Sequence, residues 1–362
     1  MTIFAGCPCC VGWRGFFTSG LATLAAPLAA QRALSQSQPD HSNTATTSLP
    51  DYAPPLPRVK ARAWRVDPRK GYLVKELKPN TFIITDGGYQ SLFVTTGHGV
   101  VLFDAPPSFA QHIGQAVAET TKEPIAKLVY SHIHIDHIGG AGRILRQNPG
   151  IEIVAEDGVA RFLSEKSDVS RPVPTTTFNN KSRLTFGSME SEMQVGYWHS
   201  PPGDLFVYFP DKSVLMAVDI MSSGSVPYMG LDLTMNMDAY IKVFDQLLWY
   251  DFEITVPGHH SNPSTRDDVR LVKDYVMDVY QTMKRIHESD HRALISRAAQ
   301  KYGLDNSYAI ARVLIDGEIA QGSNEIKNRW ITRLDNVDVW AESHCRTALV
   351  YYEWDIGPGT RA

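Results

Sequence analysis

The chain of 362 residues has an ordinary globular composition, 43% hydrophobic and 20% charged, which excludes a protein that is disordered throughout. Its formal net charge of -4 and pI near 6.3 argue against binding to nucleic acid, which requires a positively charged surface. No local cluster of lysine or arginine supplies such a surface. We therefore expect a small-molecule partner and no nucleic acid.

The first forty residues show the order of charged, apolar and polar segments that is typical of an export signal. Residues 1–14 carry one positive charge and no acid, residues 16–30 are apolar and alanine-rich, and a polar stretch follows. We predict a signal peptide at residues 1–35, which places the mature protein in the periplasm or outside the cell. Gly20 and Pro27 break an apolar stretch that is already too short to span a membrane, so we expect no stable membrane association after signal removal. A short amphipathic or disordered N-terminus is the alternative.

Cysteine usage fits this division of the chain. Cys7, Cys9 and Cys10 lie in the predicted signal, where no second cysteine pair completes a four-ligand zinc site. Cys345 is then the sole cysteine of the mature protein, which excludes an internal disulfide.

In chain order, an extended arm precedes an alternation of strands and helices. Residues 36–75 are predicted to be a linker or N-terminal arm, because Pro54, Pro55 and Pro57 favour polyproline-like backbone. Strand-like alternation begins near Thr81. The expected strands are 91–96 and 100–104 as a hairpin, 126–130, 151–155, 204–209 and 213–218 as a second hairpin, and 252–256; the expected helices are 110–121, 141–147, 238–248 and 265–287. This order predicts an α/β fold in which two mixed β-sheets pack face to face, with helices outside.

The pattern changes near residue 289. Residues 291–302, 307–320 and 337–352 have helical spacing and no metal-ligand spacing. We predict a C-terminal helical extension at 289–362 that acts as a cap or as a contact in a homo-oligomer.

The most informative motif is the run from His132 to His137. It places His132, His134, Asp136 and His137 directly after an apolar strand. Imidazole and carboxylate groups suit zinc or a neighbouring divalent ion. Alternation puts the first two histidines on one side of an extended segment, and Gly139–Gly140 allows a sharp turn after the other two. Burying four such groups without a partner is costly, so the run predicts one loop that serves two adjacent metal positions.

Further donors stand at other predicted strand ends. His199 precedes the second hairpin, Asp219 ends its apolar strand, and His259 follows the Gly258 that ends another strand. Asp104 also closes an apolar strand. His260 is the alternative to its neighbour as a ligand.

Together, these ordered motifs resemble the metallo-β-lactamase superfamily between about residues 81 and 270. The resemblance implies an αββα sandwich at residues 76–288, with a site between the sheets at one edge, in the dinuclear hydrolase branch. It favours His259 over His260, because the family ligand directly follows the glycine. It implies the following ligands: His132, His134 and His199 for the first metal, Asp136, His137 and His259 for the second, Asp219 bridging both, and Asp104 as a supporting carboxylate.

Two divalent ions, with zinc as the first choice, are therefore the expected cofactors. A water shared by two cations has its pKa lowered from about 15.7 towards neutrality, which supplies a metal-bridging hydroxide as nucleophile. The resemblance suggests that Asp136 orients this nucleophile and shuttles its proton. Tyr228 is the candidate oxyanion donor, with ordinary packing as the alternative. The same donors also accept manganese, cobalt or iron.

The predicted bridging Asp219 reduces the number of candidate reactions within the superfamily. True metallo-β-lactamases lack this aspartate, and the motif set is closer to lactonases, glyoxalase-type thioesterases and related esterases. We predict an exported metal-dependent hydrolase that cleaves a lactone or another ester of a small molecule. The alternatives are a β-lactam or thioester hydrolase of the same fold, a mononuclear iron oxygenase, and a noncatalytic binding protein.

Overall fold

The computed structural model describes residues 49–199 and 202–352. The predicted signal peptide at residues 1–35, with Cys7, Cys9 and Cys10, lies outside the described residues. Within the described part, no helix combines the length and the apolar character needed to cross a membrane. Cys345 is a buried free thiol.

Two mixed β-sheets, one of seven strands and one of five, form the centre of the fold. In the first sheet the strands are antiparallel from β1 to β4 and parallel from β4 to β7. In the second sheet β8 to β11 are antiparallel and β12 is parallel to β11. The strands are β1 (Leu73–Lys78), β2 (Thr81–Thr85), β3 (Gln90–Thr95), β4 (Val100–Phe103), β5 (Ile125–Val129), β6 (Glu152–Glu156), β7 (Thr176–Phe178), β8 (Lys181–Phe186), β9 (Met189–Val195), β10 (Leu205–Phe209), β11 (Val214–Ala217) and β12 (Ile254–Val256).

The two-residue period of the strands separates the core into layers. Leu205, Val207 and Phe209 of β10 are buried in the layer between the sheets, whereas Phe206 packs with the helices outside. Successive side chains of a strand point to opposite faces, so an almost wholly apolar strand is buried on both faces. This pattern requires helices on the outer face of each sheet.

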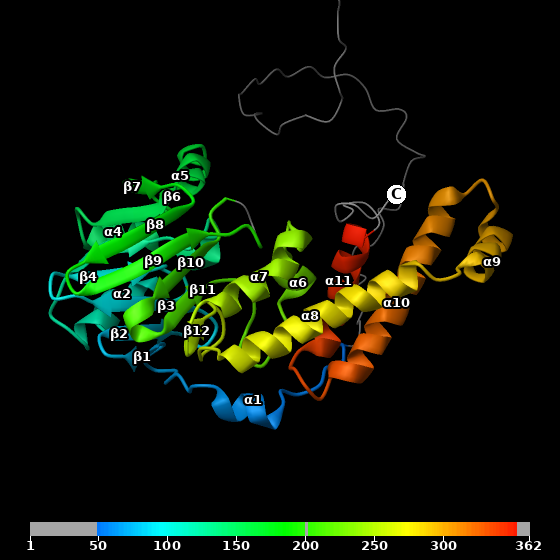
Figure 1. Cartoon of the computed structure of the whole chain (residues 1–362), viewed down its shortest axis with the longest axis horizontal. Helices are drawn as coiled ribbons and strands as arrows, with labels where there is room; N and C mark the ends of the chain where they lie inside the picture. Colours follow the sequence, from blue (N-terminus) through cyan, green and yellow to red (C-terminus); the bar gives the residue numbers. More distant parts are fainter. Residues whose placement is uncertain (1–48, 200–201, 353–362) are drawn as a thin grey trace, which may run out of the picture. The chain divides into compact units, whose positions relative to one another are not determined.

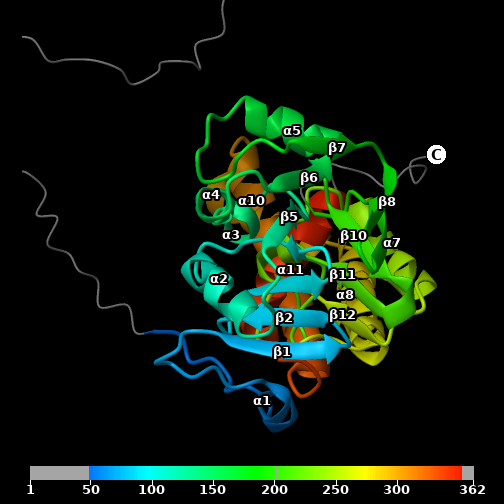
Figure 2. The same ribbon diagram turned by 90° about the vertical axis from the view of Figure 1, so that its left-hand side faces the viewer.

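Helices cover both outer faces, as Figure 2 shows with α2, α3 and α4 on one side of the strands and α7 and α8 on the other. The αββα sandwich predicted from the sequence is confirmed. The helices of the first face are α2 (Ala110–Ala118), α3 (Ile135–Ile138), α4 (Ala141–Gln147) and α5 (Asp157–Ser164); those of the second are α7 (Met237–Trp249) and α8 (Arg266–His287).

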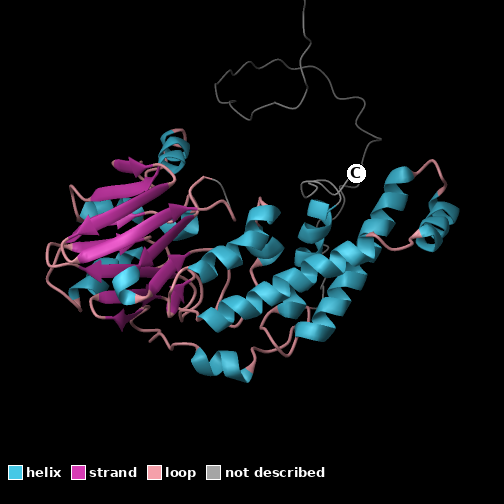
Figure 3. Ribbon diagram, viewed as in Figure 1, coloured by secondary structure: helices cyan, strands magenta, loops and turns pink. Residues whose placement is uncertain are grey.

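The C-terminal helices α9 (Arg292–Tyr302), α10 (Ser307–Trp330) and α11 (Val337–Val350) pack onto this second layer of helices. Figure 1 shows α10 and α11 against α8, and Figure 3 shows that the described chain after β12 is helical. Ile326 of α10 and Cys345 of α11 belong to the same buried cluster as residues of α7 and α8. The boundary predicted after residue 288 therefore falls inside one packed core.

The predicted N-terminal arm is partly regular structure. Pro57 begins a short helix, α1 (Pro57–Arg62), because its fixed φ angle suits the first helical position and its missing N–H needs no partner there. Arg62 pairs with Asp268 of α8 through two hydrogen bonds of 2.8 and 2.7 Å. Strand β1 was missed because its residues are half-buried or exposed and show no clear alternation.

Truncating Ile326 tests whether the C-terminal helices belong to the core. Ile326 is 0% exposed, so Ile326→Ala should lower the free energy of unfolding by about 2–5 kcal/mol. Leu304→Ala is the control, because Leu304 is 82% exposed and its loss should cost less than about 0.5 kcal/mol. Urea denaturation measures both, and equal effects of the two changes would contradict an integral role for α10.

Candidate metal centre

The His132 to His137 run leaves the carboxyl end of β5 and enters the single-turn helix α3, which carries Asp136 and His137. The predicted sharp glycine turn is wrong, because Gly139 and Gly140 have right-handed φ angles of -66° and -89°. Gly140 instead permits close packing: a Cβ atom there would lie 2.4 Å from the Ala110 side chain.

The second sheet delivers three more donors to this edge. Asp219 and His259 follow the carboxyl ends of the parallel neighbours β11 and β12. His199 precedes β10, which runs antiparallel to β11, so its N-terminal end lies at the same edge. Strand direction alone thus brings together residues that are far apart in the sequence.

The first donor group consists of three histidines around one oxygen of Asp219. Asp219 Oδ2 lies 3.2 Å from His132 Nε2, 3.7 Å from His199 Nδ1 and 3.9 Å from His134 Nδ1. One ligand atom from each of these four residues fits within 4.8 Å of the others. The set has the nitrogen and oxygen donors that zinc prefers.

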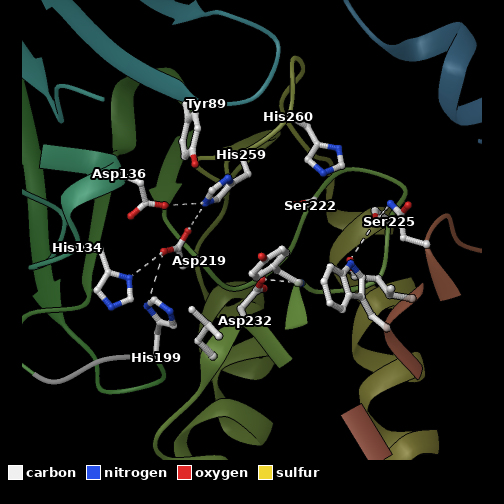
Figure 4. Close-up of a pocket in the computed structure, with 15 residues that line it drawn as sticks. Tyr89, His134, Asp136, His199, Asp219, Ser222, Ser225, Asp232, His259 and His260 are labelled. Atoms are coloured by element: carbon white, nitrogen blue, oxygen red, sulfur yellow. Dashed lines mark hydrogen bonds and ion pairs between the residues drawn. The ribbon is translucent and has the colours of Figure 1, made fainter. Parts of the chain in front are cut away.

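The second donor group lies around the other oxygen of the same carboxylate. Asp219 Oδ1 is 3.1 Å from His137 Nε2 and 3.0 Å from His259 Nε2. Asp136 Oδ2 completes the group at 3.6 and 3.9 Å from the same two nitrogens. Figure 4 shows the side chains of Asp136 and His259 on one side of Asp219, with His134 and His199 on the other. All seven predicted ligands are therefore brought together.

The residues fit a pair of cations, because several of their nitrogen and oxygen atoms lack a hydrogen-bond partner among the described residues. His132 Nε2 and Asp219 Oδ1 are buried and have no hydrogen-bond partner of acceptable geometry. The Nε2 atoms of His137 and His259 face each other at 3.1 Å, so two lone pairs converge unless one ring carries a proton there. A bound cation would satisfy both arrangements.

The electrostatics of the two groups differ. Burial lowers the pKa of His132 to about 4 and that of His199 to about 3, so both rings are neutral and ready to bind metal. Burial also acts to lower the pKa of His137, but the negative charge of Asp219 outweighs it and raises this pKa to about 9. In the absence of metal, the second group therefore holds a proton that a cation must displace.

Several residues hold the ligands in place. Ser131 Oγ lies 2.8 Å from His132 Nδ1, and the tautomer that donates to Ser131 leaves Nε2 free to bind metal. Asp104, the predicted supporting carboxylate, accepts a hydrogen bond of 2.8 Å from the backbone N–H of Ser131. Burial raises the pKa of Asp104 to about 6. Asp204 was not singled out from the sequence; it accepts a hydrogen bond of 2.8 Å from the backbone N–H of His199.

Two tyrosines line the cavity, of which one was predicted from the sequence and the other was not. Tyr228, predicted as an oxyanion donor, lines the cavity and is 54% exposed, with its ring 4.8 Å from that of Trp340. Tyr89 was missed, although its ring lies 4.9 Å from that of His259. Burial raises the pKa of Tyr89, and the charges of Asp136 and Asp219 add to this effect. No local pattern marks Tyr89, because the pairing of residues 89 and 259 joins distant parts of the chain.

The cavity beside the donor groups has a volume of about 310 Å³. Its apolar lining includes Val226, Leu233 and Trp340, the last from α11. Trp198 and Met221 stand close to predicted ligands in the sequence, but both are buried in the core and do not line the cavity. The C-terminal helices therefore form part of the cavity wall.

A left-handed turn forms the wall next to α11. The segment α6 (Met229–Leu233) has φ angles of 62°, 60°, 55° and 57° at residues 230–233. This conformation costs about 1–2 kcal/mol for each residue other than glycine. Ser343 Oγ accepts a hydrogen bond from the Gly230 N–H, and His344 Nε2 donates one of 2.9 Å to the Tyr228 carbonyl. Helix α11 thus holds the strained turn against the cavity.

Comparison with known proteins agrees with this geometry. Residues 84–275, more than half of the chain, match the profile of the metallo-beta-lactamase superfamily. The chain belongs to this superfamily. Its two donor groups are compatible with the dinuclear branch.

Individual relatives are distant. The 2,4-dinitroanisole O-demethylase subunit alpha of Nocardioides sp. (strain JS1661) is 24% identical over 53% of this chain, and the match spans only 58% of that protein's length. A double mutant of the sec-alkyl sulfatase PisA1 shares 15% identity, with a TM-score of 0.53, over 81% of this chain and 52% of that one. A metallo-beta-lactamase from Pontibacter korlensis shares 19% identity, with a TM-score of 0.48, over 56% of this chain and 99% of that one.

Removing the shared carboxylate should affect both donor groups. We expect Asp219→Ala to reduce the metal content from about two ions per chain to well below one, because each group loses a ligand. His259→Ala should remove only the second ion. His260→Ala is the matched control and should retain both, since His260 belongs to neither group. Metal analysis by mass spectrometry measures the ratios, and a second ion lost in His260→Ala but kept in His259→Ala would overturn the ligand assignment.

Acid should weaken the anchor of the left-handed turn. Burial lowers the pKa of His344 to about 4, below the 6.5 of a free histidine. The stability from its neutral form is thus present above pH 6.5 and is lost as the pH falls towards 4. When the pH is lowered from 7 to 4.5, the free energy of unfolding should decrease in both proteins. The decrease should be about 2 kcal/mol smaller for His344→Gln than for the wild type. His98→Gln, at an exposed position, should behave like the wild type, and a His344→Gln variant that also does so would contradict this role.

Proposed function

We propose that this protein is a metal-dependent hydrolase that cleaves a lactone or another ester of a small molecule. The observation that carries the proposal is that the two carboxylate oxygens of Asp219 face different groups of ligands. Oδ2 faces three histidines, and Oδ1 faces His137 and His259. A carboxylate that serves two donor groups suits two divalent ions, and we propose zinc, since the donors are nitrogen and oxygen atoms. When bound, such ions supply Lewis acidity and lower the pKa of a shared water, so that hydroxide is available near neutral pH.

Asp136 is the residue of the second group best placed to handle a proton. Its side chain is 37% exposed and lines the cavity, whereas that of Asp219 is 7% exposed. A carboxylate at the cavity surface can accept a hydrogen bond from the nucleophile and pass the proton to a leaving group or to solvent. We therefore keep the predicted orienting and proton-transfer role for Asp136.

The proposed role of Tyr228 is to donate a hydrogen bond to the oxygen that becomes negative during ester cleavage. Its exposed side chain lines the same cavity as the two donor groups. Trp340 packs against its ring and limits its freedom to move. Hydrogen-bond donors held in place before the reaction stabilise such a charge most effectively.

The size and composition of the cavity support a small substrate. A volume of about 310 Å³ lies at the lower end of the range for small-molecule sites, and apolar and polar residues line it together. We propose that the protein acts on this substrate after export, on the basis of the leader at residues 1–35.

The curated relative supplies a second candidate reaction. It is named for the O-demethylation of 2,4-dinitroanisole, an activated aryl methyl ether. Hydrolysis of such an ether would use the same nucleophile on a different C–O bond, so this compound belongs in the substrate panel.

Substrate profiling of the metal-loaded protein tests the proposal. The panel should contain lactones, aryl esters, thioesters, β-lactams and 2,4-dinitroanisole, with kcat/KM measured before and after removal of metal by a chelator. We expect lactones or esters to be cleaved fastest, and Tyr228→Phe to lower kcat by on the order of 100-fold at unchanged metal content. Oxygen consumption with about one metal per chain and no ester turnover would instead identify an iron oxygenase.

A further inference from the structure

Asp232 is a buried carboxyl group on the cavity wall that neither donor group uses. Its Oδ1 accepts a hydrogen bond of 2.7 Å from the backbone N–H of Tyr228. Its Oδ2 is buried and has no hydrogen-bond partner among the described residues, although the residue lines the cavity. Asp232 is 7% exposed, so bulk water does not readily satisfy this oxygen.

The neighbouring polar groups do not supply the missing donor. The Tyr240 hydroxyl lies within reach of the Asp232 carboxyl group and acts to lower its pKa, but its single proton is donated at 2.7 Å to the carbonyl of Ile220. The Asn336 side-chain amide donates to Ser225 Oγ, and Ser225 donates to the carbonyl of Val226. Tyr240 and Ser225 thus donate their single hydroxyl protons elsewhere, and among the described residues Asn336 makes no hydrogen bond to Asp232.

The electrostatic surroundings do not satisfy the carboxyl group either. Burial and the negative charge of Asp219 together raise the pKa of Asp232 to about 7, while the Tyr228 N–H and the nearby His259 act in the opposite direction. A buried oxygen without a partner destabilises the folded protein, and a water or a ligand in the cavity would remove this cost.

The backbone fixes the position of this carboxyl group. Asp232 lies in the left-handed turn of α6, which Ser343 and His344 anchor to α11. In the view of Figure 4, Asp232 lies between Asp219 and Ser225. A rigid acceptor close to the reaction centre loses little entropy when it binds a ligand.

We propose that Asp232 is a specificity-determining residue that accepts a hydrogen bond from a hydroxyl or amide N–H group of the substrate. This inference rests on the proposed function, because it requires the substrate to occupy the same cavity. Leu233 and Trp340 beside it suit an apolar or aromatic body. The substrate class is therefore an ester or lactone with an apolar body that carries a hydrogen-bond donor.

Matched ligand pairs isolate this hydrogen bond. The probes are the ortho, meta and para isomers of hydroxyphenylacetate, each compared with its methoxy counterpart, which keeps the oxygen but cannot donate. Calorimetric titration into the zinc-loaded full chain gives each Kd. For at least one isomer, we expect the hydroxy compound to bind on the order of 10- to 100-fold more tightly than the methoxy compound.

Asp232→Asn should remove most of this preference. The Asn oxygen still accepts from the Tyr228 N–H, while the amide nitrogen faces the cavity as a donor. The ratio of the two Kd values should fall at least tenfold at unchanged metal content. Asp245→Asn is the matched control, since it makes the same chemical change on the exposed face of α7 and should leave the ratio unaltered. The wild-type ratio is itself a test that does not depend on the folding of any variant.

The outcomes separate the two proposals. No difference within any pair, no binding of any probe, or a ratio that persists in Asp232→Asn would each overturn the role of Asp232. Turnover of the phenyl esters of the same acids tests the hydrolase separately. Selective binding without turnover would refute the hydrolase while the role of Asp232 in recognition stands.

Discussion

The buried charge of Asp219 is the constraint on which the rest of the site depends. A carboxylate that is 6% exposed needs partners for its charge, and in this fold five histidine nitrogens lie within 4 Å of its two oxygens. His137, whose pKa is raised, supplies a positive charge among them. Three neighbouring strands of the second sheet end or begin at this point, and the first sheet adds the loop after β5. The pKa of Asp219 is held well below its usual range because the nearby histidines outweigh the cost of burial. The negative charge that this arrangement preserves is the one that two cations would share.

The C-terminal helices connect stability with recognition. Helices α10 and α11 share a buried cluster with α7 and α8, and α11 also contributes Trp340 to the cavity. Through Ser343 and His344 the same helix holds a backbone conformation that would be unfavourable in isolation. The extension is therefore both part of the core and part of the wall that a substrate meets.

The sequence revealed the fold and the donor cluster because both leave local marks. His132, Asp219 and His259 each stand beside an apolar strand or a glycine, so their placement could be read without the tertiary structure. Tyr89 and Asp232 leave no such mark, since their positions depend on contacts with segments more than one hundred residues away. Strand β8 was missed because its exposed and half-buried residues alternate without a strongly apolar face.

A crystal structure of the metal-loaded protein, with anomalous scattering recorded at the zinc edge, tests the central claim most directly. Our account predicts two anomalous peaks, one beside each oxygen of Asp219, with His132, His134 and His199 around the first and Asp136, His137 and His259 around the second. A single peak, or two peaks that Asp219 does not bridge, would contradict it.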